Sequence, residues 1–434
     1  MQKEMQTKSP LNPWYYVPSA YFMEGLPWAV INLLAGIIFV RMGVSIEKYA
    51  FWTGLLGLPW IIKAFLAPLV DGNKTKRFWI VFTQYLISVV FLLAAIGLNF
   101  SSFFQTTWLC FFIGAFLSAT HDIALDGYYM IALSEKKQAF FLGIRNTVYR
   151  AAMLTVSGPL VVIAGVLERK TGNIGLSWAA VLAAAAAFGL LLNTYHLIVL
   201  PRPAGDAPQK AELKEPVLYL SVFKSYLTQK NILFILLFIL IYPMSDALLG
   251  KIALPFLLKA KETGALALST QAYGVIQGTF GLLASMTGAI GGGLLIAKFG
   301  FRKCIWWFAA LMLLPNILYA FMAFNAASVG EGLVAFFVIF ENLGDGIGFI
   351  AFTFFVMVVS NGAYKTSFYA ISTSIMALSQ MGFAMFSGKL FTMLGSNYAQ
   401  YFLVVSFMSL LTFLLVPLSY KVDKMKLAQS NMEK

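Results

Sequence analysis

Residues 118–129 read Ser-Ala-Thr-His-Asp-Ile-Ala-Leu-Asp-Gly-Tyr-Tyr and lie inside an apolar segment that begins near Thr107. A bilayer-spanning helix needs about 20 mostly apolar residues, and this segment is long enough. Asp122 and Asp126 are four positions apart, so a helix places both carboxylates on one face, about one turn from each other. An isolated charge in hydrocarbon costs roughly 2.5 kcal/mol or more. The pair must therefore face a cavity or a partner.

The rest of the chain has the composition of a helical membrane protein. Of its 434 residues, 60% are apolar and only 11% are charged. A soluble protein of this length needs a more highly charged surface. Cys110 and Cys304 lie in or at different apolar segments, which argues against a disulfide framework or a zinc site. The first thirteen residues contain no short apolar core with a cleavage site, so we expect no removable signal peptide.

Apolar segments recur from one end of the chain to the other and predict an all-α membrane protein with twelve transmembrane helices. The predicted spans are residues 15–40, 49–70, 78–98, 107–132, 139–167, 175–200, 231–258, 272–297, 304–324, 332–359, 367–392 and 398–420. The longest polar connector divides them into two sets. We predict an N-terminal six-helix half (1–200), a central connector (201–230) and a C-terminal six-helix half (231–434).

Basic residues are distributed unevenly between the predicted loops. Most of the 31 Lys and Arg residues fall on the side of the membrane that also holds both termini and the central connector. Loops rich in Lys and Arg stay in the cytoplasm, so both termini are predicted to be cytoplasmic. The net charge of +13 is explained by these loops rather than by binding of nucleic acid.

Short acidic motifs occur at corresponding positions of the two halves. The fourth span contains Asp122 and Asp126 followed by Gly, and the tenth contains Glu341 and Asp345 followed by Gly. Glu24 in the first span has a counterpart in Asp246 of the seventh. Together these matches favour two parallel six-helix pseudo-repeats with a binding site between them.

The fourth and fifth spans are joined by a short turn and can form an antiparallel hairpin. The helical rise then places Asp126 and Arg145 about 9 Å deep, and Asp122 and Arg150 about 15 Å deep. Arginine pairing would keep the aspartates ionised, whereas an unpaired aspartate becomes a proton carrier. Static ion pairs that join two helices are the alternative interpretation.

Further polar groups in the spans are candidates for coupling or for substrate binding. His121 lies about 100° around the helix from Asp122, and either relays protons or packs between helices. Lys63 either binds an anionic group of a substrate or pairs with Glu24 or Asp71. Tyr149 lies near the charges and either stacks on a sugar ring or packs against helices. Embedded charges that complete the candidate substrate contacts are Glu24, Asp246, Lys251, Glu341 and Asp345.

Several stretches resemble the major facilitator superfamily, and in particular its AmpG-type muropeptide permeases. The stretches that carry the resemblance are the basic loop after Asp71, residues 300–303, residues 25–27, residues 58–71 around Lys63, residues 121–127, residues 246–256 and residues 387–390. The resemblance implies proton-driven import of anhydro-muropeptides, which are GlcNAc-anhydro-MurNAc with or without peptide, for peptidoglycan recycling. Asp122 and Asp126 match the paired aspartates of the family, and His121 stands where the family usually has Gln.

The sequence thus predicts a proton-coupled symporter of the inner membrane. The predicted proton-coupling residues are Asp122, Asp126 and His121, and the predicted substrate contacts are Lys63, Arg145, Arg150, Glu24, Tyr149, Asp246, Lys251, Glu341 and Asp345. Its partners would be an anionic, sugar-containing small molecule, protons and the lipid bilayer, with no nucleic acid, and the chain would act as a monomer.

Other classes of function remain as alternatives. Because the family is related to acetyl-CoA transporters, the solute could instead be acetyl-CoA or a nucleotide-like anion. A non-transporting membrane sensor is less well motivated, since no soluble signalling domain accompanies the spans. The sequence contains no nucleophile triad, zinc-ligand spacing or Walker motif, so we expect no enzyme, metal or cofactor.

Overall fold

The computed structural model describes residues 11–63, 66, 70, 74–207, 223–360, 365–419 and 422. Over this part of the chain all regular elements are helices. Ten of these helical segments are long and apolar enough to cross a membrane. Of the remaining predicted spans, 367–392 coincides with α18 (Lys365–Met393), and 49–70 overlaps α3 (Ile46–Leu55) and α4 (Leu58–Ile61). Most of 49–70 after Lys63 lies outside the described residues. The predicted all-α membrane protein is confirmed.

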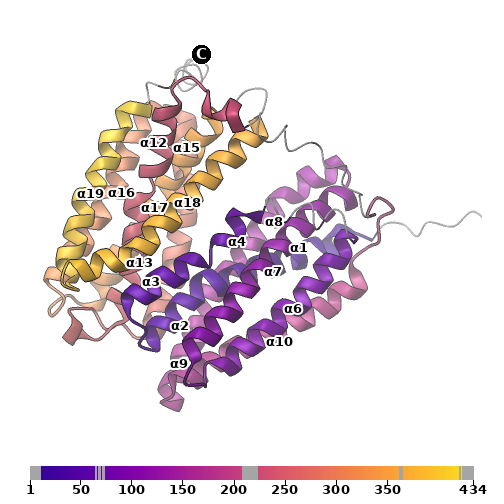
Figure 1. The fold of residues 1–434 in the computed structure, drawn as a ribbon, viewed down its shortest axis with the longest axis horizontal. Helices are drawn as coiled ribbons and strands as arrows, with labels where there is room; N and C mark the ends of the chain where they lie inside the picture. The colour runs from indigo at the N-terminus through magenta and orange to yellow at the C-terminus, as the bar shows by residue number, and fades with distance from the viewer. Residues whose placement is uncertain are drawn as a thin grey trace, which may run out of the picture. The chain divides into compact units, whose positions relative to one another are not determined.

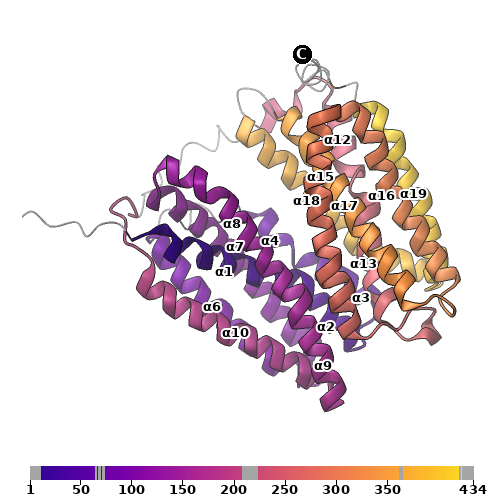
Figure 2. The same ribbon diagram turned by 180° about the vertical axis from the view of Figure 1, so that it is seen from behind.

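The chain forms two compact units, each built from segments that are not continuous in sequence. Unit 1 comprises Met1–Ala35, Ile62–Val156 and Lys170–Glu212. Its helices are η1 (Pro13–Tyr15), α1 (Val17–Ala29), η2 (Val30–Leu34), α6 (Lys76–Gly97), α7 (Phe103–Ala132), α8 (Glu135–Thr155) and α10 (Ile174–Val199). Figures 1 and 2 both show α6 and α10 lying side by side.

Unit 2 comprises Gly36–Ile61, Ser157–Arg169 and Leu213–Lys434. Besides α3, α4 and α18 it holds α2 (Ala35–Arg41), η3 (Val156–Leu160), α9 (Val161–Thr171), α12 (Ile232–Ile241), α13 (Met244–Leu258), η4 (Lys261–Thr263), α14 (Thr270–Tyr273), η5 (Gly274–Gly281), α15 (Leu282–Phe299), α16 (Phe301–Phe324), α17 (Glu331–Val359) and α19 (Tyr398–Ser419). In both ribbon views α16 lies beside α19. Much of the predicted connector, 201–230, lies outside the described residues, and the division into halves at that point stays a prediction.

Three of the predicted spans contain a turn of π-helix. These turns, η2, η3 and η5, join α1 to α2, α8 to α9 and α14 to α15. Pro159 lies within η3 and has no backbone N–H to donate, which favours a change in the hydrogen-bonding pattern at that point. Each of the three spans is therefore a continuous but locally widened helix.

Capping side chains and one glycine set several helix ends. The Thr75 hydroxyl accepts a hydrogen bond from Phe78 N at the start of α6, at 3.1 Å. Asn173 Oδ1 does the same for Leu176 N at the start of α10, at 3.0 Å. Gly300 has a φ of 79° and is the single residue between α15 and α16. That left-handed conformation favours glycine and permits the abrupt reversal of the chain.

Unit 1 depends on a close crossing of α1 and α8. A Cβ atom at Gly25 would lie 2.7 Å from the carbonyl oxygen of Tyr149, so no larger residue fits without displacing the backbone. Small residues allow such close approach, and inside a membrane this packing replaces the hydrophobic drive that operates in water. Gly25 thus brings the polar residues of α1 close to those of α8.

Candidate functional site

Asp126 of α7 forms an ion pair with Arg145 of α8. Arg145 Nη1 lies 3.0 Å from Asp126 Oδ1, and the hydroxyl of Tyr21 on α1 donates a hydrogen bond to the same oxygen at 3.2 Å. Arg145 also donates to the Tyr21 hydroxyl at 3.0 Å and lies 4.6 Å from the centroid of the Tyr21 ring. The predicted pairing of Asp126 with Arg145 is therefore confirmed. The Asp126 side chain is still 40% exposed.

Asp122 pairs with Lys63 rather than with Arg150. Lys63 Nζ donates to Asp122 Oδ2 at 2.6 Å, and the Lys63 side chain is 45% exposed. The predicted pairing with Arg150 was wrong, because the five positions from Arg145 to Arg150 rotate the side chain about 140° around the helix. Arg150 accordingly lies exposed.

Glu24 brings a third carboxyl group to the same place. It is 9% exposed, and its Oε2 atom has no hydrogen-bond donor among the described residues. The Glu24 carboxyl group lies close enough to Asp122 for the two to interact electrostatically. Two ionised carboxylates this close together repel each other, which favours a proton on one of the two.

The three acids and two cations then balance. Glu24, Asp122 and Asp126 together with one proton match the two positive charges of Lys63 and Arg145. Charges inside a membrane are tolerated when they are paired in this way. Removing the charge of any one of these five side chains therefore changes the number of protons that the three acids bind.

Tyr149 lies at the edge of this cluster. Its ring centroid is 6.4 Å from that of Trp28, with the ring planes tilted by 51°. Both residues come from the α1–α8 crossing that Gly25 permits. The structure thus places an aromatic pair on the same two helices as Glu24 and Arg145.

His121 faces away from the acids. It is 1% exposed, and its Nε2 accepts from Gln84 Nε2 at 2.9 Å. The Gln84 Oε1 atom contacts His196 Nδ1 at 2.9 Å, and His196 Nε2 contacts the Ser19 hydroxyl at 3.0 Å. We call the chain His121–Gln84–His196–Ser19 the histidine network. It connects α7, α6, α10 and α1.

The acidic residues predicted in the C-terminal half meet within unit 2. Asp246 of α13, and Glu341 and Asp345 of α17, line one small cavity. Lys251 of α13 does not join them. Its Nζ donates to the Thr53 hydroxyl at 3.0 Å and lies 5.7 Å from the ring centroid of Tyr49. The positive charge of Lys251 thus faces α3.

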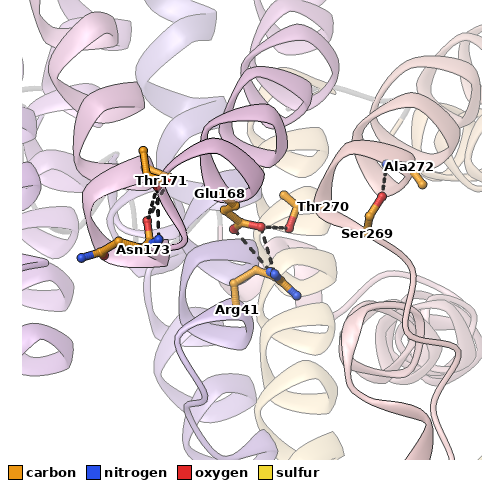
Figure 3. Close-up of polar contacts among 8 residues, drawn as sticks. Arg41, Glu168, Thr171, Asn173, Ser269, Thr270 and Ala272 are labelled. Carbon is orange, nitrogen blue, oxygen red and sulfur yellow. Dashed lines mark hydrogen bonds and ion pairs between the residues drawn. The ribbon is translucent and has the colours of Figure 1, made fainter.

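Glu168 organises an ion pair in unit 2, which Figure 3 shows. Arg41 Nη2 lies 2.9 Å from Glu168 Oε2, and Arg41 Nε lies 3.3 Å from Oε1. The Thr270 hydroxyl donates to Oε2 at 2.7 Å. We call these three residues the Glu168 cluster. It joins α2, α9 and α14, which are far apart in sequence.

A larger cavity of about 670 Å³ lies between α3 and α18 in unit 2. Its charged and aromatic lining residues are Glu47, Lys48, Lys389, Phe51, Trp52 and Phe386. Its volume lies in the range of small-molecule sites. No motif or spacing in the sequence indicates that these residues meet.

Sequence reasoning missed several residues of these sites. Tyr21, Gln84 and Glu168, and Asn316 of α16, which also lines the small cavity of unit 2, are common residue types within or at the ends of apolar spans, and no spacing rule connects them with their neighbours in these sites. His196 was also missed, and it is fully buried in the histidine network. Its only signal was its rarity, since the chain has two histidines.

Comparisons with known proteins identify the type of protein. No family model matches the chain. The chain is 24% identical over 367 residues to the anhydromuropeptide permease of Escherichia coli strain K12, covering 83% of this chain and 70% of the relative. It is 23% identical to a Rickettsia felis protein described as transporter AmpG 4, covering 92% of this chain and 95% of that one.

Solved transporter structures share the fold. A nucleoside transporter, NupG in its D323A form, superposes with a TM-score of 0.73 at 15% identity, covering 94% of this chain and 100% of that chain. A bacterial homologue of the lysosomal transporter Spinster gives a TM-score of 0.70 at 15% identity, covering 95% and 98%. The D-xylose-proton symporter gives 0.67 at 13% identity, covering 94% and 97%.

These likenesses confirm the predicted resemblance. The fold is that of major facilitator superfamily transporters, and the chain is similar to AmpG-type permeases. It is a multi-pass membrane protein of transporter type, and its relatives transport small solutes.

Proposed function

We propose that this protein is a proton-coupled symporter that imports anhydro-muropeptides across the bacterial inner membrane for peptidoglycan recycling. The observation that carries the proposal is the balanced cluster of Glu24, Asp122 and Asp126 with Lys63 and Arg145. It occurs in a chain similar to an anhydromuropeptide permease.

Proton coupling follows from competition for the two cations. A muropeptide carries carboxylates, and Lys63 and Arg145 are both partly exposed. A carboxylate that binds Lys63 releases Asp122, which then takes up a proton because an unpaired charge in the membrane is costly. Arg145 and Asp126 are related in the same way. In this mechanism substrate and proton bind together, as symport requires.

The roles of the remaining candidates follow from their places. Tyr149 would stack on a sugar ring of the substrate, and Arg150 would contact an anionic group from the exposed side of α8. We leave His121 out of the coupling pair because it faces Gln84. Asp122 is the proposed proton carrier, and Asp126 is held more firmly, by both Arg145 and Tyr21.

Transport by the purified full-length protein tests the proposal. Proteoliposomes with an inward proton gradient should accumulate labelled GlcNAc-anhydro-MurNAc. Asp122→Asn should abolish accumulation but keep exchange of labelled for unlabelled solute, because the binding step does not need the proton gradient. Arg169→Gln, at an exposed arginine, is the matched control and should behave as the wild type.

Two results would contradict the proposal. Undiminished proton-driven accumulation in both Asp122→Asn and Asp126→Asn would remove the coupling role of the pair. Transport of acetyl-CoA without transport of the anhydro-disaccharide would replace the substrate class.

A further inference from the structure

A second acidic cluster lies in unit 2, apart from the cluster of unit 1. Glu341 and Asp345 are four positions apart on α17 and so share one face of that helix. Asp246 approaches them from α13, and Asn316 approaches from α16. The cavity that these four side chains line has a volume of about 10 Å³. A cavity of this size holds about one water molecule, so a sugar does not fit.

Asn316 lines this cavity and carries a buried amide oxygen without a donor among the described residues. Asn316 is only 1% exposed, and its Nδ2 donates to the carbonyl oxygen of Met312 at 3.2 Å. Its Oδ1 has no hydrogen-bond donor among the residues that the structure describes. A buried acceptor without a donor costs about 1–3 kcal/mol. The cavity therefore has an acceptor in place for a particle that donates a hydrogen bond or carries positive charge.

The carboxyl groups themselves require a proton. Asp246, Asp345 and Glu341 line the same small cavity, so their three carboxyl groups lie close together. Three ionised carboxylates around so small a cavity would repel one another, so the cluster requires a bound proton or another small cation. Among the described residues no basic side chain forms an ion pair with any of the three acids.

The neighbouring titratable groups do not neutralise the cluster either. Lys251, on the same helix as Asp246, is directed to Thr53. Tyr242 donates its hydroxyl to the carbonyl oxygen of Gly348 at 3.2 Å and lies near Asp345. Tyr273 and Tyr319 lie near Glu341. All of these tyrosines are neutral groups, so the charge of the acids is left for a small cation to balance.

We propose that Asp246, Asp345 and Glu341, with Asn316, form a second proton-binding site, located in unit 2 and separate from the Asp122–Asp126 pair. A metal ion fits less well, because no group of three His, Cys, Asp or Glu residues in the described ranges could hold one. Asp246 and Asp345 share one proton, and Glu341 accepts a second when the cavity closes around it. The coupling of this site to transport rests on the proposed function, whereas proton binding itself does not.

Infrared spectroscopy of the purified full-length protein tests proton binding without any substrate. Protonated carboxyl groups have a C=O stretching band that carboxylates lack. The wild type should show this band at neutral pH, and Asp246→Asn and Asp345→Asn should each lose a component of it. Asn316→Leu should shift that component in frequency, because the amide faces the proton-bearing group. Glu262→Gln, at an exposed carboxylate of unit 2, is the matched control and should leave the band unchanged.

Three outcomes would overturn the proposal. They are the absence of the band in the wild type, its full retention in both aspartate variants, and its loss when sodium replaces choline, which would make this a sodium site. Glu341→Gln provides a further test if one aspartate variant does not fold, since it should shift the band of the remaining pair.

Transport then tests coupling separately. With GlcNAc-anhydro-MurNAc as the probe, Asp345→Asn should keep solute exchange and lose part of the proton-driven accumulation. Wild-type accumulation in Asp345→Asn would overturn the coupling role. If the wild-type protein does not transport this probe, the proposed function fails, but the infrared result still decides whether the site binds a proton.

Discussion

Lys63 and Asp122 show how much of the site depends on a single long-range pair. They are separated by 59 positions in sequence and meet at 2.6 Å. Loss of either partner costs free energy, because the charge left alone in the membrane must be hydrated, neutralised or moved. If another group takes the place of Lys63, the charge of that group therefore decides whether Asp122 is protonated.

Lys63→Gln should lower the stability of the protein by about 1–3 kcal/mol, because it leaves Asp122 without its cation. The double variant Lys63→Gln/Asp122→Asn should recover part of that loss, with a coupling free energy of about 0.5–3 kcal/mol. Apparent melting temperatures of the wild type, both single variants and the double variant measure this. Strictly additive losses would show that the ion pair does not contribute.

His121→Gln should keep proton-driven solute accumulation. The side chain faces Gln84 and not the acids, and glutamine can still hydrogen bond to Gln84. Proteoliposome uptake at several pH values measures the effect. Loss of accumulation with solute exchange intact would return His121 to the coupling pathway.

The pairing of Asp126 with Arg145 could be predicted from sequence, whereas that of Asp122 with Lys63 could not. The rise of a helix fixes depth, and the hairpin of α7 and α8 is local. The position of Arg150 around the axis of α8 excludes it as the partner of Asp122. The sequence around Lys63 does not indicate which helix its side chain contacts. The proximity of Glu24 to Asp122 was missed for the same reason, since α1 and α7 are distant in sequence.

At the scale of the helix, close crossings decide which polar residues meet. Gly25 allows α1 to contact the backbone of α8. A second crossing in unit 2 places Gly278 against Ser157, whose hydroxyl donates to the Gly278 carbonyl oxygen at 2.7 Å. The glycines were visible in the sequence, but their partners were not.

Gly25→Ala should destabilise unit 1 by about 1–3 kcal/mol, because the added methyl group would lie 2.7 Å from the Tyr149 carbonyl oxygen. It should also reduce uptake, since Glu24 and Arg145 would move apart. Gly250→Ala is the matched control, because a Cβ atom at Gly250 meets nothing within 4 Å. That change should leave stability equal or raise it by about 1 kcal/mol through better helix propensity. Melting temperatures that fall equally in both variants would contradict this explanation.

The presence of each helix could be predicted from the sequence, but the π-helical segments within three of them could not. The apolar spans 15–40, 139–167 and 272–297 were each predicted as one helix, and each contains a π-helical turn. Hydrophobic periodicity does not distinguish a π turn from an α turn within so short a segment. Pro159 was a visible signal for one of the three turns, but η5 contains no proline.

At the scale of the whole molecule, the contacts do not follow the order of the chain. Residues 36–61 and 157–169, which belong to the predicted N-terminal half, pack within unit 2. The Glu168 cluster is part of this arrangement, because Arg41, Glu168 and Thr270 all lie in that unit. The apolar spans could be predicted from the sequence. It could not be predicted that residues 36–61 and 157–169 pack with the segments of unit 2.

Glu168→Gln should weaken the packing of α9 against α2 and α14 by about 2 kcal/mol, because Arg41 loses its anionic partner. A cysteine placed at Thr270 should then react faster with a membrane-impermeant thiol reagent than it does with Glu168 intact. Glu262→Gln, at an exposed acid, is the control and should not change the reaction rate. Equal rates in all backgrounds would show that the Glu168 cluster does not restrain α14.

The histidine network has a consequence for proton movement. Imidazole rings and hydroxyl groups can pass a proton along a hydrogen-bonded chain, because each can gain a proton on one side and lose one on the other. The Gln84 amide cannot, since its nitrogen does not readily give up or accept a proton. Gln84 lies between His121 and His196, so a proton cannot pass from one histidine to the other through it. The histidine network therefore joins four helices of unit 1 through buried polar contacts without forming a proton path between its two histidines, so within unit 1 the proposed proton binding stays on the acidic side of α7.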